Sequence, residues 1–80
     1  MNRIEIEEKY EDEKMLFADG FDKAIIGVAH IQNKCIVAYN TKKCIQILMK
    51  HMTHNEAVEY FDFNVLGSYV GEYTPAFIEK

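Results

Sequence analysis

The sequence predicts an α+β domain in which a three-stranded antiparallel sheet packs against two helices on one face. Two runs rich in β-branched residues, separated by a short polar break, predict a β-hairpin within residues 23–39. Two stretches with helical spacing of apolar residues follow at 41–52 and 53–66, and a short apolar run surrounds Pro75. Because these patterns follow one another within residues 15–80, the expected order is β-β-α-α-β around one core.

The hairpin is expected to join residues 23–32 to residues 35–39 through a turn at Asn33 and Lys34. Asparagine tolerates left-handed backbone geometry, which two-residue hairpin turns require. Gly27 interrupts the first strand and predicts either a bulge or the close approach of a neighbour.

Two amphipathic helices are predicted after the hairpin, the first capped by Asn40 or Thr41. Thr53 and Glu56 form a Thr-x-x-Glu capping box that starts the second helix and is worth on the order of 1 kcal/mol. The buried positions of the first helix are Cys44, Ile45, Leu48, Met49 and Met52, and those of the second are Ala57, Val58, Phe61, Val65 and Leu66.

The second helix is expected to end at Gly67 or Gly71, and residues 73–78 to form the last strand. Proline cannot donate a hydrogen bond to a sheet, so Pro75 places this strand at an edge or stands at its first position.

Residues 1–14 are predicted to form a flexible acidic tail, or at most a short helical turn, outside the core. Residues 1–22 hold eight of the 13 acids, whereas residues 23–80 are almost neutral. The chain therefore lacks the basic surface of a nucleic-acid-binding protein, and Lys42, Lys43 and Lys50 on one helix side are a weak exception. The acidic head is either a solvated segment or a nucleic-acid mimic toward a basic partner.

The composition also argues against a membrane span, a metal centre and a bound cofactor. The apolar runs are far shorter than the roughly 20 residues that a span needs, and no signal peptide opens the chain, so a cytoplasmic protein is expected. Cys35 and Cys44 are expected to be reduced, buried thiols, because neither belongs to a recognisable zinc-binding spacing.

Three groups of side chains could carry chemistry. Asp19 and Asp22 flank a glycine and could hold a cation, although turn formation explains both. His30 and Cys35 should lie close across the hairpin turn, where a Cys–His pair is conceivable, but no third orienting residue is evident. The acids of the second helix are expected to be ordinary surface charges.

Aromatic residues are concentrated near the C-terminus, in numbers that one helix on a small sheet cannot bury. Exposed aromatic side chains favour an interface, with an enlarged core as the alternative. The candidate interface residues are Tyr60, Phe63, Tyr69, Tyr73 and Phe77.

From Leu16 onward the chain resembles a family of very short tailed-bacteriophage proteins of unknown function. The resemblance rests on residues 16–22, 24–27, 43–45, 48–49, 56–61, 63–65, 67, 69–72 and 74–75, and the acidic residues 1–14 lie outside it. It implies no established activity or catalytic residue.

Together these observations predict a small non-enzymatic phage accessory protein that binds a host or phage macromolecule, such as a host-takeover or anti-defence inhibitor. A homodimer is expected, because both faces of the predicted hairpin carry apolar side chains. The alternative is a small ligand-binding or enzymatic module whose contacts are Asp19, Asp22, Asn64 and Glu72.

Overall fold

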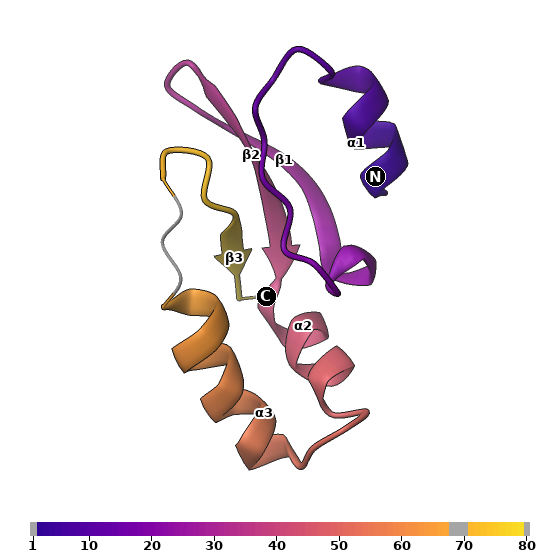
Figure 1. Ribbon diagram of the computed structural model, residues 1–80, viewed down its shortest axis with the longest axis vertical. Helices are drawn as coiled ribbons and strands as arrows, with labels where there is room; N and C mark the ends of the chain where they lie inside the picture. Colours follow the sequence, from indigo (N-terminus) through magenta and orange to yellow (C-terminus); the bar gives the residue numbers. More distant parts are fainter. Residues whose placement is uncertain (1, 68–70, 80) are drawn as a thin grey trace.

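The centre of the fold is strand β2 (Lys34–Asn40), which lies between β1 (Ile25–Ile31) and β3 (Ala76–Ile78) in a three-stranded sheet (Figure 1). The structure, a computed structural model, describes residues 2–67 and 71–79. Strands β1 and β2 pair antiparallel, whereas β2 and β3 pair parallel. The β-β-α-α-β order from Ile25 onward agrees with the prediction, but the sheet is mixed and the all-antiparallel expectation is wrong.

The parallel pairing of β3 follows from the path of the chain after the helices. Helices α2 (Thr41–Leu48) and α3 (His54–Tyr60) carry the chain away from the sheet and back, and from Gly71 onward the chain reverses direction into β3 beside β2 (Figure 1). A turn at Gly71, with φ of 112°, makes this reversal. The backbone N–H and the hydroxyl of Thr74 both donate to the Gly71 carbonyl, at 3.2 and 2.7 Å. Pro75 directly precedes β3, an edge strand, as its lack of an N–H predicts.

The hairpin turn lies one residue earlier than predicted. Gln32 and Asn33 connect β1 to β2, and Gln32 takes the left-handed conformation with φ of 55°. The predicted bulge is confirmed, because the register shifts between Ile25 and Gly27. A Cβ atom added to Gly27 would meet nothing within 4 Å, so the bulge and not close packing explains this glycine.

The predicted helix caps are confirmed in geometry. The Asn40 side chain accepts a hydrogen bond from the Lys43 backbone N–H at 3.1 Å, which settles the first cap. At α3, the Thr53 N–H donates to a Glu56 carboxylate oxygen at 2.9 Å, and the Glu56 N–H donates to the Thr53 hydroxyl at 3.3 Å.

Helices α2 and α3 stand at one end of the sheet, whereas the sequence predicted them on its face (Figure 1). The reason is local: β2 ends at Asn40 and α2 begins at Thr41, so no connecting residues are available to fold the helix back over the strands. The molecule is therefore elongated, with extents of 38 × 22 × 20 Å.

A π-helical segment, η2 (Phe61–Leu66), continues α3. Its wider turn changes the rotation per residue, so positions extrapolated at 3.6 residues per turn drift from the buried face. Phe61 is buried as predicted, whereas Leu66, expected inside, is exposed.

An N-terminal helix, α1 (Arg3–Lys9), occupies the segment that the sequence placed outside the core. Its start is fixed by a reciprocal capping box between Asn2 and Glu5, with hydrogen bonds of 2.9 and 3.1 Å. Ile4 is exposed, but Ile6 is fully buried in the core cluster. The sequence predicted at most a short helical turn outside the core here, because residues 1–14 are so rich in acids and few apolar residues mark a buried face.

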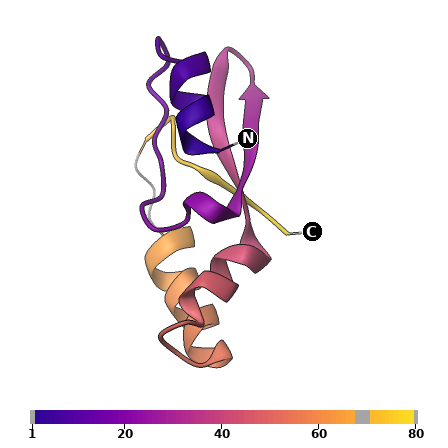
Figure 2. The ribbon, with the colours of Figure 1, turned by 90° about the vertical axis from the view of Figure 1, so that its right-hand side faces the viewer.

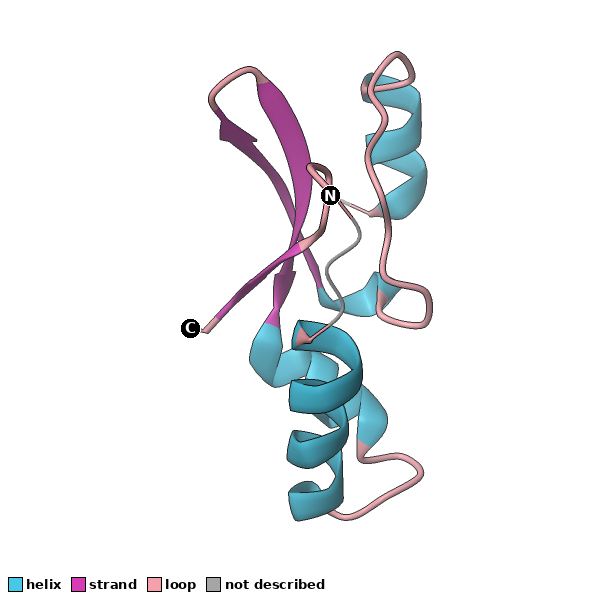
Figure 3. Ribbon diagram, turned by 60° about the vertical axis from the view of Figure 1, so that its left-hand side comes forward, coloured by secondary structure: helices cyan, strands magenta, loops and turns pink. Residues whose placement is uncertain are grey.

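Helix α1 and the loop that follows it lie on one side of the hairpin, and the described segments leave the other side open (Figures 2 and 3). Val37 and Tyr39 point to the covered side and belong to the core, so the alternate residues of β2 point to the open side. By the register, this face combines small residues with Ile36, Ile31 and Ile78. Ile36 and Ala38 in its middle are buried, whereas Ile31 and Ile78 at its ends are exposed.

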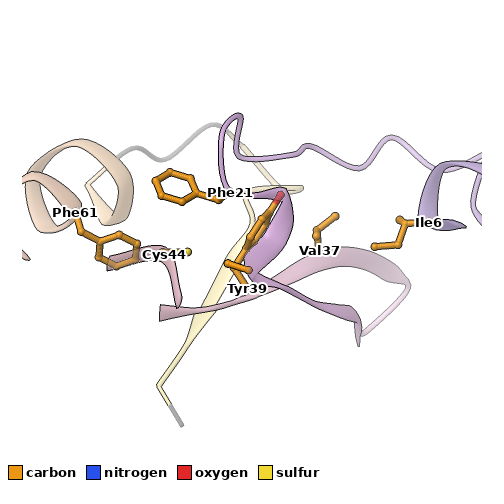
Figure 4. Close-up of a cluster of buried hydrophobic side chains, with 7 residues drawn as sticks. Ile6, Phe21, Val37, Tyr39, Cys44 and Phe61 are labelled. Atoms are coloured by element: carbon orange, nitrogen blue, oxygen red, sulfur yellow. The ribbon is translucent and has the colours of Figure 1, made fainter. Parts of the chain in front are cut away.

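The core runs along the covered face from α1 to α3, as the labelled side chains in Figure 4 show. Its buried members come from α1, the segment before β1, β2, α2 and η2: Ile6, Phe21, Ala24, Val37, Tyr39, Cys44 and Phe61. Phe77 connects the part of the core around Tyr39 to the part around Phe61. Its ring stacks on Tyr39 with centroids 5.4 Å apart and packs edge-on against Phe61 at 5.3 Å. Burial raises the pKa of the Tyr39 hydroxyl.

Candidate functional site

A cleft of ≈ 640 Å³ lies where the loop 16–21, the end of α2, the α3–η2 helix and the start of β3 meet. Its apolar lining includes Leu16, Phe21, Leu48, Val65 and Phe77, several of which also pack on the core. This volume lies within the range of about 300–1,000 Å³ that is usual for ligand pockets. We call this hollow the main cleft.

Polar side chains are placed around the same cleft by three different elements. Asp19 comes from the loop before β1, Lys50 and His51 follow the end of α2, and Tyr60 and Asn64 come from α3 and η2. The arrangement, an apolar lining with a few polar groups around it, is typical of a site that recognises an apolar group and orients it by hydrogen bonds.

A second, shallower hollow of ≈ 540 Å³ adjoins α3 and is lined by Met52, Glu59 and Phe63 among others. Tyr60 and Asn64 line both hollows and therefore join them into one surface. Phe63 is 81% exposed, the largest exposed fraction among the bulky apolar residues of the structure. We call this second hollow the α3 hollow.

The structure separates the five predicted interface residues. Tyr60 and Phe63 are exposed beside the α3 hollow. Phe77 packs on Tyr39 and Phe61, so it supports the core and lines the main cleft. Tyr73 is half-buried, and Tyr69 lies outside the described residues.

Asp19 and Asp22 are brought together by an arginine of helix α1. Both carboxylates lie 3.5 Å from the Arg3 guanidinium, which also lies 3.7 Å from Glu7 and 4.5 Å above the Phe17 ring. The two aspartates thus attach α1 to the loop before β1. The functional contacts predicted for them stay a prediction. Because the side chains of Asp19 and Asp22 are 94% and 50% accessible, these ion pairs contribute little to stability.

The other two predicted contact residues lie in different places. Asn64 lines the main cleft together with Asp19. Glu72 is exposed in the turn before β3 and does not belong to the residues that line the main cleft. Among the four residues, the cleft therefore includes Asp19 and Asn64.

The predicted proximity of His30 and Cys35 is confirmed. The two residues are direct partners in the β1–β2 register, and the Cys35 sulfur lies 3.3 Å from His30 Nδ1. The Tyr10 ring stands beside the imidazole, with centroids 6.2 Å apart. Cys44, in contrast, is fully buried in the core, and burial raises the pKa of its thiol to about 11.

Sequence reasoning missed Arg3 and His51 as residues of interest, and it considered Lys50 only as part of a weak basic helix side. Arg3 was assigned to a tail, so its ion pairs with the loop before β1 were not foreseen. Lys50 and His51 lie just beyond the C-terminus of the first helix, where the helix dipole favours basic side chains, and that position was a signal for them.

Within residues 2–67 and 71–79, no helix has the length and apolar character needed to cross a membrane. The same residues contain no group of three or more histidine, cysteine, aspartate or glutamate side chains placed to hold a metal ion. Comparison of the chain with protein-family models, with curated proteins and with solved structures gives no match in any of the three. The resemblance to short phage proteins therefore stays a prediction.

Proposed function

We propose that this chain is a small non-enzymatic accessory protein, encoded by a tailed bacteriophage, that binds a protein of the host or the phage through the α3 hollow and the adjoining main cleft. A host-takeover or anti-defence inhibitor is the form of this function that the phage resemblance favours. Such a protein would act in the cytoplasm of the host cell.

The observation that carries the proposal is the exposure of Phe63. Because the Phe63 side chain is 81% exposed, folding buries little of its apolar surface. It lies beside Tyr60, which is 45% exposed. Aromatic residues of this kind are enriched at the centres of protein interfaces, where a partner removes them from water.

The neighbouring charges support a protein partner over a nucleic acid. The α3 hollow is lined by Glu56 and Glu59 as well as by His51, and the net charge of the chain is −4. A phosphate backbone would be repelled by these carboxylates, whereas a protein segment with one apolar anchor and a basic flank would be complementary to them.

Affinity capture tests this proposal with the tagged full chain and a lysate of phage-infected host cells. The wild-type chain is expected to retain a partner that Phe63→Asp loses, because the charge would be desolvated at the interface centre. Ile4→Asp is the matched control, since Ile4 is similarly exposed at 66% but lies on α1. Equal capture by both variants and the wild type would refute the role of this surface.

A second candidate function is a small ligand-binding module, and the size of the main cleft is the observation that favours it. In this version Asp19 and Asn64 would orient a ligand whose apolar part contacts Phe21 and Phe77. Asp22 and Glu72 would contact the ligand from the edge of the cleft, since neither belongs to its lining. Ligand-observed NMR with a fragment library, repeated with Asn64→Ala, distinguishes it: a ligand lost by Asn64→Ala and retained by Phe63→Asp favours the module.

Self-association is the third part of the proposal. The open face of the sheet ends in exposed Ile31 and Ile78, and the edges formed by β1 and β3 bound the sheet on either side. A second copy placed by a two-fold axis would cover this face without any further partner.

A further inference from the structure

The Cys35–His30 pair lies near the hairpin turn, away from the main cleft and the α3 hollow. The sulfur-to-nitrogen distance of 3.3 Å is within hydrogen-bond range for a thiol. An imidazole that carries its proton on Nε2 presents Nδ1 as an acceptor, so the Cys35 S–H can donate to it. His30 is exposed, and the proton it accepts can therefore be exchanged with water.

The two cysteines of the chain differ in both respects that control thiol chemistry. Cys35 keeps 9% of its surface accessible and has a base in contact, whereas Cys44 has 0% and is surrounded by the core. Thiolates are the reactive form of cysteine, so an adjacent proton acceptor raises reactivity and apolar burial lowers it. The raised pKa of Cys44, about 11, agrees with an inert core thiol.

The geometry points to Cys35 as a site of oxidation by small hydroperoxides, with His30 as the group that moves the proton. In the reaction, His30 Nδ1 takes the thiol proton and the Cys35 sulfur attacks one peroxide oxygen. The O–O bond breaks, and the proton passes from His30 to the leaving oxygen. With hydrogen peroxide the products are Cys35 sulfenic acid and one water, so sulfur loses two electrons and the peroxide gains them.

The small accessible area selects the class of oxidant. Cys35 is largely buried, with 9% of the residue accessible, so a two-oxygen molecule needs less room to reach the sulfur than a disulfide, which must approach along the axis of its S–S bond. A small peroxide therefore fits this site better than a peptide disulfide.

The test uses the full chain, hydrogen peroxide as the oxidant and dimedone to trap sulfenic acid, with peptide mass spectrometry to assign each cysteine. We expect Cys35 to be labelled and Cys44 to stay unlabelled in the same molecules. His30→Gln keeps a hydrogen-bond acceptor but cannot carry the proton, so it should slow Cys35 labelling by about tenfold, a modest value for the loss of a general base.

His54→Gln is the matched control, because His54 is an exposed histidine at the start of α3, far along the chain from Cys35. It should leave the labelling rate unchanged. Cys44 also reports unfolding, since a disrupted core would expose it. Equal labelling of the two cysteines in the folded wild type, or an unchanged rate in a folded His30→Gln, would overturn the inference.

Discussion

The Ala18 backbone N–H donates a hydrogen bond of 2.8 Å to the hydroxyl oxygen of Tyr39, a residue that has no accessible surface. This bond ties the loop before β1 to the central strand of the sheet. It also gives the polar end of the largest fully buried side chain a partner, which a buried hydroxyl needs.

Tyr39→Phe removes the acceptor and leaves the Ala18 N–H without it in a partly buried place. We expect a loss of about 1–3 kcal/mol in the free energy of unfolding, measured by urea denaturation. Tyr60→Phe, at an exposed position, is the control and should change stability little. An unchanged unfolding midpoint for Tyr39→Phe would mean that water replaces the tyrosine oxygen.

Ile6 and Ile4 provide a matched pair within helix α1, one fully buried and the other 66% exposed. Ile6→Ala should destabilise the protein by about 2–5 kcal/mol, because it opens a cavity in the core. Ile4→Ala should have almost no effect on unfolding. If Ile6→Ala lowered the free energy of unfolding as little as Ile4→Ala, residues 1–14 would be a dispensable tail.

Gly67 is required by close packing, because a Cβ atom there would lie 2.8 Å from the Phe63 carbonyl oxygen. Its φ of −76° is accessible to any residue, so conformational freedom is not the reason. Gly67→Ala should cost about 1–3 kcal/mol and shift the η2 backbone amides in an NMR spectrum. Gly27→Ala, which meets no neighbour, is the control for side-chain clash.

The α3 capping box predicts a pH dependence. Hydrogen bonds from the Thr53 backbone N–H, and next from its side chain, hold the pKa of Glu56 below its ordinary value. Because the folded pKa is lowered, the stabilisation from ionised Glu56 is present above the ordinary glutamate pKa and is lost as pH falls through the lowered value. Denaturation of Glu56→Gln across the acid range should lack this component. Identical acid profiles for the two proteins would contradict the assignment.

The proposed dimer predicts a mass of twice 9.3 kDa by light scattering at micromolar concentration. Ile31→Asp places a charge on the open face and should give a monomer, while Ile4→Asp should leave the mass unchanged. A wild-type monomer at hundreds of micromolar would exclude self-association and leave the open face to another partner.

Local signals in the sequence predicted local structure well. The Asn40 and Thr53 caps, the bulge near Gly27 and the buried Phe61 each depend on a few neighbouring residues, and the structure confirms them. The direction of β3 was wrong because it depends on where the chain travels between η2 and Ala76, and no residue pattern encodes that path.

The candidate site was harder to predict for the same reason. Tyr60 and Phe63 could be recognised as surplus aromatic residues, but the main cleft combines segments from four parts of the chain. Arg3 shows the limit most clearly: its partners Asp19 and Asp22 were noticed as acids, and only the fold supplies the cation between them.

The parallel pairing of β3 with β2 also determines how the sheet should assemble in time. The β1–β2 hairpin and the α2–α3 pair connect residues that are close in sequence, so the entropy lost in closing them is small. The β2–β3 pairs join residues separated by the whole α2–α3 segment, so closing that loop costs more entropy, and the three residue pairs are few. It is therefore expected to dock last during folding and to detach first in the native state, with the fastest amide exchange of the three strands. Each detachment would uncover one edge of β2, the strand around which the whole molecule is built.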